Sequence, residues 1–593
     1  MSIIYIISII LLFIIVLTLK KSDKKLEIIK TVFLVLTLNV AYNVFVCYIL
    51  NLINIPITLI NLSIVNLLLA ITCGIKIIRD KSIQKYYIEK KNVLVVVLMC
   101  IITVGVLYAN FGNLTKIRYI SMDGREHYKV AREFSENETL TNKQTENYTV
   151  GPTFMPAGYV NAGILLKIFK PYLGTVELYK IYILFESYIY LLASVMFYFT
   201  VNKINSKKSK INMMITIIFS IIYALGYLLN SWISGFHYLV IGILFITAIL
   251  YVIGEIIEKN KLNRLSQIIL IFLLNLGLIF SYCLFCPFVY LAEFIYFTYK
   301  YWKNEKIKLA ILTLVVLIIP GIIGVIYLVF PNSTGVTNGM ALEGYIYKNI
   351  WSNIIAFIPF TIYYFYYNIK NKKITIENIM LTLLIIFMII LFIGTKIGKC
   401  SEYYFYKNYY ILWLLLIYSN INGMIKFSEK DSKKNVITLT YTVLYIIIFI
   451  ISLITTDTFI KLESQDSSIM EIFTFNKTMM FSKNAEFVTK DELQLYKKVE
   501  ELIDGKWKEH DNKILFATDG TQSHWIVSLT GYDDKLHEKT IEIIQRIKNN
   551  SYKYIVVSEN REAYDTIKKY MNYEMLEKIY ENNDQKIYML KGE

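Results

Sequence analysis

Long apolar runs alternate with short polar connections through the first 455 residues of the chain. About 20 consecutive apolar residues are needed to cross hydrocarbon that is about 30 Å thick. The pattern therefore predicts a multi-pass α-helical membrane protein with about fourteen spans. The predicted spans lie near 2–19, 29–50, 55–77, 93–111, 176–201, 212–231, 237–257, 267–284, 286–302, 308–330, 351–369, 378–396, 404–424 and 436–455.

Lysine and arginine gather in every second connection between these runs, for example at 20–25, 79–91, 259–264 and 426–434. Short cytoplasmic loops carry an excess of such residues. This distribution predicts that the N-terminus, the 112–175 loop, the 331–350 loop and the C-terminal region all lie outside the plasma membrane. It also accounts for much of the net charge of +16, so we do not expect nucleic acid to be a partner.

The composition changes near Asp457 from apolar to mixed and charged. Strand-like segments at 514–519 and 554–558, with helical patterns between and after them, predict a small extracytoplasmic α/β domain. Three parts follow: N-terminal transmembrane helices (1–92), a transmembrane core with the external loop 112–175 (93–455) and the α/β domain (456–593). Polar residues follow the first strand, where α/β sheets often bind ligands, although a solvated loop explains them more simply: Asp519, Gly520, His524, Asp533 and Asp534.

The composition argues against a soluble domain and against a disulfide-rich or cysteine-based site. A hydrophobic content of 55% and a positive mean hydropathy exclude an ordinary soluble domain. Six scattered cysteines indicate no disulfide framework. Cys283 and Cys286 form a CxxC pair, but their apolar surroundings favour packing thiols over a redox or metal site.

The clearest chemical candidate is the polar passage YISMDGREHYKVAREF, which begins at Tyr119. Asp123 and His127 are four residues apart and share one face of a predicted helix. Asp123 and Glu126 also match a helix cap and its carboxylate partner, and capping and catalysis stay open as explanations. The Pro/Gly-punctuated segment VGPTFMPAGY follows at 150–159.

Other predicted outward groups add cations and aromatic rings. The cations are Arg125, Lys396, Lys399 and Lys407, and Tyr403 and His237 lie at the same predicted level. A single cation of this kind is also typical of a side chain that reaches the membrane surface. Glu186 and Glu293 fall inside predicted spans, where a carboxylate needs either a function or a helix–helix hydrogen bond.

The passage resembles the first external loop of GT-C-fold glycosyltransferases, such as the protein mannosyltransferases and the aminoarabinose lipid A transferases. The resemblance rests on Asp123, His127, Ala131, Pro152, Pro156 and Gly158. The tyrosine-rich run at 398–415 is similar to a late segment of these enzymes. The resemblance implies transfer of a sugar from a polyprenyl-phosphate donor to a glycan, lipid or protein acceptor at the outer face of the membrane.

In such a transfer, Asp123 is expected to take the proton of the acceptor hydroxyl, with Glu126 and His127 assisting. The leaving lipid phosphate needs a cation, for which Lys407 is the first choice among Arg125, Lys396, Lys399 and Lys407. Tyr403 and His237 are expected to contact substrate. Glu126 and His127 are too few to predict a metal, so the cofactor stays open. The alternatives are a transporter or flippase for lipid-linked glycans, which would carry paired charges at mid-membrane, and a non-catalytic assembly component.

Overall fold

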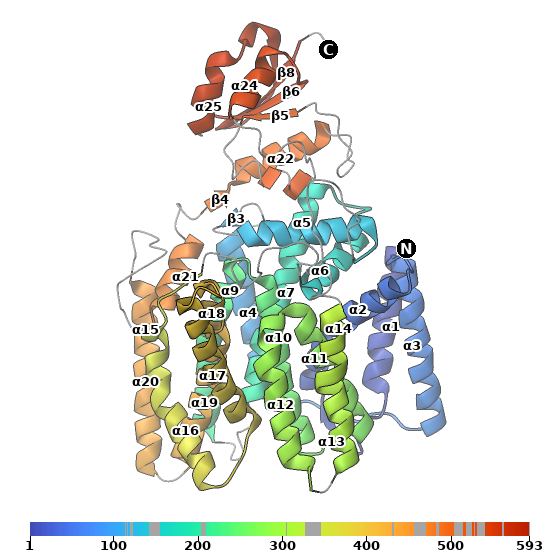
Figure 1. Ribbon diagram of the computed structural model, residues 1–593, viewed down its shortest axis with the longest axis vertical. Helices are drawn as coiled ribbons and strands as arrows, with labels where there is room; N and C mark the ends of the chain where they lie inside the picture. Colours follow the sequence, from blue (N-terminus) through green and yellow to red (C-terminus); the bar gives the residue numbers. More distant parts are fainter. Residues whose placement is uncertain are drawn as a thin grey trace.

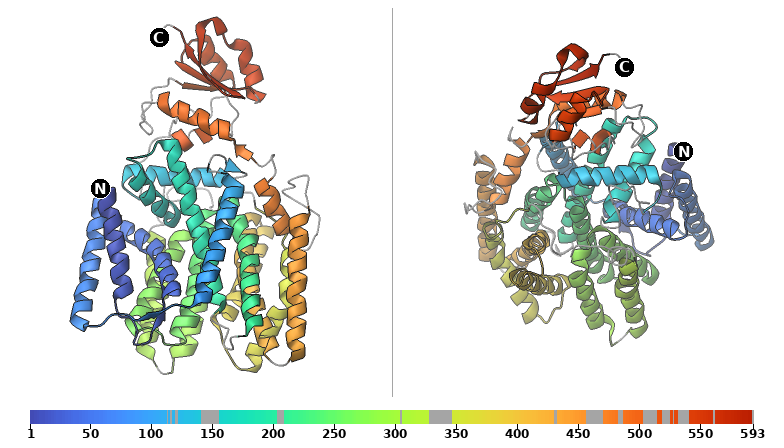
Figure 2. Two further views of the ribbon diagram at one scale, coloured as in Figure 1. Left: turned by 180° about the vertical axis from the view of Figure 1, so that it is seen from behind. Right: turned by 45° about the horizontal axis from the view of Figure 1, so that its top comes forward.

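The computed structural model describes residues 1–593 except 113, 115–116, 119–121, 141–154, 203–208, 304, 327–345, 430–431, 456–469, 482–485, 503–513, 518–524, 527, 531–539, 560–561 and 592–593. A bundle of long helices carries a layer of shorter helices across one end, and a small sheet domain lies beyond that layer (Figure 1). The view from behind shows the same three levels (Figure 2).

Eleven helical segments in the described part are long and apolar enough to cross a membrane. They are α2 (Ile28–Leu52), α3 (Leu59–Asp80), α4 (Lys90–Phe111), α7 (Thr175–Asn202), α8 to α9 (Lys210–Ile233), α10 with its π-helical end η2 (His237–Ile257), α11 (Arg264–Ser281), α13 to α14 (Lys306–Gly324), α17 (Ile376–Lys396), α18 with α19 (Glu402–Ser428) and α20 (Ser432–Ile454). Three other predicted runs form shorter helices. The first two are α1 (Ser2–Thr18) and α12 (Cys286–Tyr301), and the run 351–369 is divided into α15 (Trp351–Ile354), the 3₁₀ turn η7 (Ile355–Phe357) and α16 (Ile358–Lys370). The predicted multi-pass helical class is confirmed, while the number of fourteen spans is not.

Close helix packing depends on glycine where α16 meets α19. A Cβ atom added to Gly423 of α19 would lie 2.0 Å from the backbone oxygen of Phe360 in α16. Small residues of this kind let helix backbones approach each other inside a membrane, where water supplies no driving force for association. This contact therefore fixes the position of α16 against the core helix α19.

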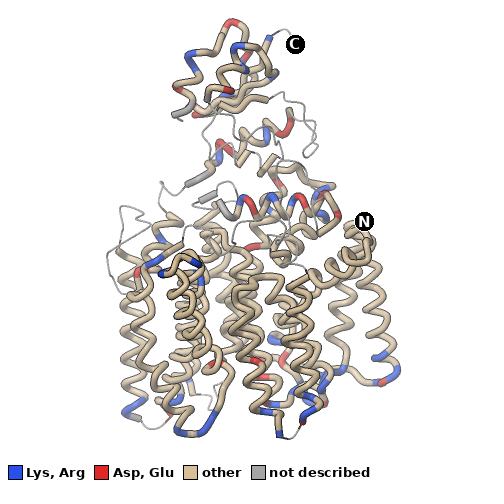
Figure 3. Tube along the Cα trace, in the orientation of Figure 1, with Lys and Arg blue, Asp and Glu red and all other residues tan. Residues whose placement is uncertain are grey.

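Lysine and arginine gather at the lower end of the bundle in Figure 3, in the turns between helices. We call this the basic end. It contains the turns that follow α1, η2 and α16, which carry the predicted clusters around Lys20, Lys259 and Lys372. Helix α5 (Met122–Asn137) lies across the opposite end, next to α6 (Pro156–Phe169).

The C-terminal region adds further elements on the α5 side of the bundle (Figure 1). They are α21 (Glu471–Phe481), α22 (Lys490–Leu502), α24 (Thr540–Lys548) and α25 (Glu562–Ile567). The sheet has the order β5-β6-β8-β7, from Ile514–Ala517, Tyr554–Ser558, Gln585–Leu590 and Leu576–Glu581. β5 and β6 are parallel and the other pairs are antiparallel. The predicted small α/β domain is thus confirmed, including both predicted strands.

A strand pair and a helix cap are among the contacts that join the C-terminal region to the bundle. Strand β3 (Ile117–Arg118), in the loop before α5, pairs with β4 (Glu486–Val488). The carboxylate of Glu500 in α22 accepts hydrogen bonds from the backbone N–H groups of Thr175 and Val176 at the start of α7. The first N–H groups of a helix have no partner within the helix, so Glu500 acts as a cap supplied from a distant part of the chain.

Candidate functional site

Five polar side chains from four helices meet just below α5. We call them the His–Lys cluster: His127 of α5, Glu186 of α7, His237 and Tyr238 of α10, and Lys407 of α18 (Glu402–Lys407). The turn before α10 requires Gly235, whose φ of 80° lies in the left-handed region that other residues avoid. This turn places His237 and Tyr238 in the first turn of α10.

The histidines lie against each other and against a carboxylate. Nε2 of His237 lies 2.9 Å from Oε1 of Glu186, and both side chains are less than a tenth exposed. The rings of His127 and His237 meet edge to face with centroids 5.2 Å apart, and His127 meets Tyr238 in the same way at 4.9 Å. Glu186 therefore contacts His237, and His237 in turn packs against His127.

Lys407 is buried, with 1% of its surface exposed, inside an aromatic cage. Its ammonium donates a hydrogen bond of 2.6 Å to the hydroxyl of Tyr238. It also lies over four aromatic rings, with distances to the centroids of 4.1 Å for Tyr403, 4.4 Å for Phe236, 4.8 Å for Tyr238 and 5.6 Å for Tyr282. Ring faces attract a cation, and the attraction grows when water is removed. The cage thus holds a positive charge at a fixed place beside the histidines.

Burial lowers the pKa of His127 well below its usual range, and the nearby His237 and Lys407 lower it further. The imidazole of His127 is consequently neutral at pH 7. A neutral imidazole has one nitrogen that donates and one that accepts a proton. His127 can therefore accept a proton from a bound hydroxyl group or pass it on.

This pKa shift predicts that the protein loses stability in mild acid. Below a pH of about 6.5 the unfolded chain binds a proton at His127 that the folded chain does not, so the stability of the folded state falls as the pH drops further. Apparent melting temperatures of the detergent-solubilised chain, measured from pH 8 to pH 5.5, should fall below pH 6.5. His127→Gln should reduce that fall, and an identical fall in both proteins would contradict the assignment.

The structure brings together several residues predicted from the sequence. His127, His237, Tyr403 and Lys407 lie in or against the cluster. Asp123 belongs to α5, one turn before His127, and its side chain lies outside the described part of the structure. Pro152, Asp519, Gly520, His524, Asp533 and Asp534 also lie outside the described residues.

The other predicted cations lie apart from the cluster contacts. Arg125 is buried and donates two hydrogen bonds, of 3.0 and 2.7 Å, to the neighbouring carboxylate of Glu126. Lys396 is exposed at the end of α17, where its ammonium lies 5.3 Å from the ring centroid of Phe392. Lys399 is exposed in the following turn. The sequence analysis therefore proposed the buried Lys407 together with the exposed Lys396 and Lys399. A lysine near a helix end has the same sequence pattern whether it is buried or exposed.

The sequence analysis missed the aromatic members of the site. Phe236, Tyr238 and Tyr282 form the cage with Tyr403, and Tyr182 packs edge to face on His237 with centroids 5.4 Å apart. The sequence does not distinguish these residues, because the chain has 49 tyrosines and most of them are explained by the enrichment of tyrosine at membrane–water interfaces. Among the described residues, no group of three or more His, Cys, Asp or Glu side chains is placed to hold a metal ion.

Aromatic contacts continue from the cluster into the C-terminal region. Tyr182 stacks with Tyr179 at 6.1 Å, and Tyr179 meets the fully buried Trp525 edge to face at 5.6 Å. Trp525 belongs to the segment after β5. The C-terminal region therefore packs directly on the helix that carries Glu186.

No protein-family model and no curated protein matches this sequence. Solved structures do match. The apo oligosaccharyltransferase of Archaeoglobus fulgidus aligns with 81% of this chain and 71% of its own length, at 10% identity and a TM-score of 0.46. The AglB oligosaccharyltransferase of that organism, in complex with an inhibitory peptide and a dolichol-phosphate, covers the same shares at 11% identity and a TM-score of 0.46.

ArnT from Cupriavidus metallidurans, bound to undecaprenyl phosphate, matches as well. It aligns with 83% of this chain and 97% of its own length, at 9% identity and a TM-score of 0.43. Both kinds of protein are GT-C-fold membrane glycosyltransferases, the group that the sequence resembles.

Proposed function

We propose that the chain is a membrane glycosyltransferase that moves a sugar from a polyprenyl-phosphate donor to a glycan, lipid or protein acceptor. The observation that carries this proposal is the buried, caged ammonium of Lys407 beside the neutral His127, one turn from Asp123. A fixed cation next to proton-accepting groups is what transfer from a phosphate leaving group requires.

In the proposed reaction, the acceptor hydroxyl oxygen attacks the anomeric carbon of the donor sugar. A new carbon–oxygen bond forms there, and the bond from the same carbon to the lipid phosphate breaks. The phosphate leaves with the electron pair, and Lys407 stabilises its growing negative charge. The hydroxyl proton passes to Asp123, and His127 is placed to assist that transfer.

The remaining charged and aromatic groups either position these residues or contact the substrates. Glu186 holds His237, and His237 and Tyr238 pack on the ring of His127. Arg125 and Glu126 form a pair on α5. In this proposal that pair contacts the acceptor, and Lys396 and Lys399 meet the donor phosphate as it approaches along the membrane surface.

We place this reaction on the outer side of the plasma membrane, with the C-terminal region extracytoplasmic. The support is the separation of charge along the bundle: the basic end lies opposite α5 (Figure 3). Loops rich in lysine and arginine stay in the cytoplasm. On this placement the His–Lys cluster lies on the outer side of the bundle.

The direct test is an assay in membranes that contain the full chain and radiolabelled polyprenyl-phosphate sugars. Wild type should transfer label to an acceptor and release one polyprenyl phosphate for each sugar transferred. Asp123→Asn should lower the rate about 100-fold, because the amide cannot take a proton. Asp23→Asn is the matched control, since Asp23 is exposed at the basic end and pairs only with Lys20 among the described residues.

Three results would contradict the proposal. Equal transfer by wild type and Asp123→Asn at equal expression would exclude Asp123 as the base. Movement of intact lipid-linked sugar across the membrane, with no release of polyprenyl phosphate, would instead indicate a flippase. Membranes in which neither release nor movement occurs would indicate a non-catalytic component.

A further inference from the structure

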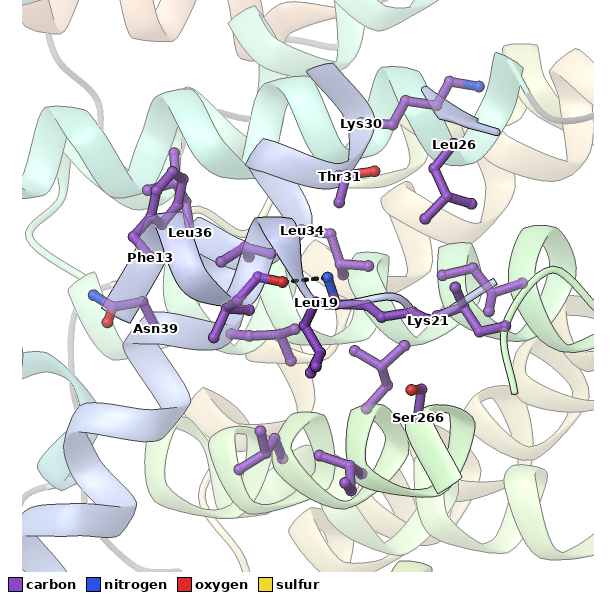
Figure 4. A pocket seen from close by; sticks show the side chains of 18 of the residues that line it. Phe13, Leu19, Lys21, Leu26, Lys30, Thr31, Leu34, Leu36, Asn39 and Ser266 are labelled. Atoms are coloured by element: carbon purple, nitrogen blue, oxygen red, sulfur yellow. Dashed lines mark hydrogen bonds between the residues drawn. The ribbon is translucent and has the colours of Figure 1, made fainter. Parts of the chain in front are cut away.

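A cavity of about 620 Å³ lies near the basic end of the bundle, away from the His–Lys cluster. Helices α1, α2, α3 and α11 line it, together with η2 at the end of α10. Figure 4 shows side chains of α1, α2 and α11 pointing into the space between these helices. The N-terminal helices thus leave an apolar space between themselves and the core.

The walls of the cavity are mainly apolar. They include Phe13, Val16, Leu34, Leu38, Leu270 and Leu273. A space of this volume lined by aliphatic side chains favours hydrocarbon over water, because water needs two or more polar partners. An apolar space of this size has room for one acyl chain.

The lining also contains four lysines, and they come from the segments of the basic end: Lys21, Lys25, Lys30 and Lys261. Its one carboxylate, Glu27, accepts hydrogen bonds from the backbone N–H of Lys30 at 2.6 Å and of Glu89 at 3.3 Å. Lys261 pairs with Glu255. Lys21 donates a hydrogen bond to the carbonyl oxygen of Val16, the contact drawn in Figure 4.

The charge of this lining is therefore not balanced within it. No carboxylate among the described residues pairs with Lys21 or Lys25. Burial lowers the pKa of Lys21 to about 8, so Lys21 is still mostly protonated at pH 7. A positive charge that is partly buried against hydrocarbon is costly unless an anion meets it.

We propose that this cavity binds an anionic glycerophospholipid. One acyl chain fills the apolar space between α2 and α11, and the phosphate meets Lys21 and Lys25. Cationic pockets between membrane helices on the cytoplasmic side commonly bind acidic head groups. The bound lipid joins the N-terminal helices to the core. This inference is independent of the proposed transfer reaction, because the cavity lies at the opposite end of the bundle.

The test measures the melting temperature of the detergent-solubilised full chain in mixed micelles. Phosphatidylglycerol should raise it by about 2 °C or more at saturation, while phosphatidylcholine with the same acyl chains should not. Lys25→Gln should weaken the effect, with about fivefold more phosphatidylglycerol needed for half of the shift. Native mass spectrometry should show one phosphatidylglycerol retained by wild type.

The matched control is Lys372→Gln, which removes a charge from an exposed turn at the same end of the bundle. This variant should respond to phosphatidylglycerol as wild type does. Ser266→Phe, which fills the α11 wall, should abolish the shift; if it fails to fold, Lys25→Gln decides alone. Equal shifts with both phospholipids, equal responses of Lys25→Gln and Lys372→Gln, or displacement of phosphatidylglycerol by equimolar polyprenyl phosphate would overturn the proposal.

Discussion

Replacing Lys407 with methionine is expected to lower the rate of sugar transfer about 1,000-fold while the protein stays folded. The ammonium is the buried cation held by Tyr238, Tyr403, Phe236 and Tyr282. A preorganised cation at a developing negative charge typically contributes two to three orders of magnitude to the rate. Methionine is similar in size to lysine and packs well against aromatic rings, so its side chain fills the space between the four rings.

The measurement is the release of polyprenyl phosphate by purified variants, together with their melting temperatures. Replacing a buried charge by an apolar group of similar volume is often neutral or stabilising, so the melting temperature should not fall. Lys348→Met is the control, because Lys348 also lies near a tyrosine ring, 5.7 Å from that of Tyr406, but its side chain is 39% exposed. The control should lose less than about twofold. Similar losses in both variants would mean that Lys407 has no special role.

The largest effect on stability is expected for Gly423→Ala in α19. The added Cβ would lie 2.0 Å from the backbone oxygen of Phe360, an atom that no side-chain rotation can move. The two helices must separate, which costs about 3 kcal/mol or more and opens the core on both sides of α16. The melting temperature in detergent should fall by about 2 °C or more, and less protein should elute as a single species in size-exclusion chromatography.

Gly105→Ala provides the comparison, because a Cβ atom on Gly105 of α4 meets nothing within 4 Å. Alanine is favoured over glycine inside a helix by about 0.5 to 1 kcal/mol. This variant should therefore melt at the same temperature as wild type or slightly above it. Equal destabilisation of the two variants would show that the backbone, rather than the contact with Phe360, is responsible.

The helical bundle could be predicted because each membrane span is a continuous apolar run in the sequence. Such a run forms a helix, since only a helix makes all its backbone hydrogen bonds within one segment. The predicted runs 2–19, 286–302 and 351–369 become α1, α12 and α16, of 17, 16 and 13 residues. Sequence periodicity does not reveal where such helices end, because polar and apolar residues mix near their termini. The C-terminal strands at 514–517 and 554–558 were predictable from their β-branched and aromatic residues, whereas β7, with its charged sequence LEKIYE, was missed.

The candidate site was predictable only in part. His127, His237 and Lys407 are separated by long stretches of chain, and only the fold shows that they meet. Lys407 resembled the exposed Lys396 and Lys399 in sequence, since burial depends on how α18 packs on the start of α10. The cage residues Tyr238 and Tyr282 carried no local pattern that distinguished them from the other tyrosines.

Glu500, which caps the first turn of α7, is synthesised long after α7 itself. The two capped N–H groups precede Glu500 by 325 and 324 residues. At about 5 to 20 residues per second, a ribosome needs about 15 to 65 s to cover that distance. During this interval α7 lies in the nascent chain with its first turn uncapped and with no Trp525 against Tyr179. The helix that holds Glu186 is thus completed only near the end of translation, so truncated products of interrupted synthesis are expected to be inactive.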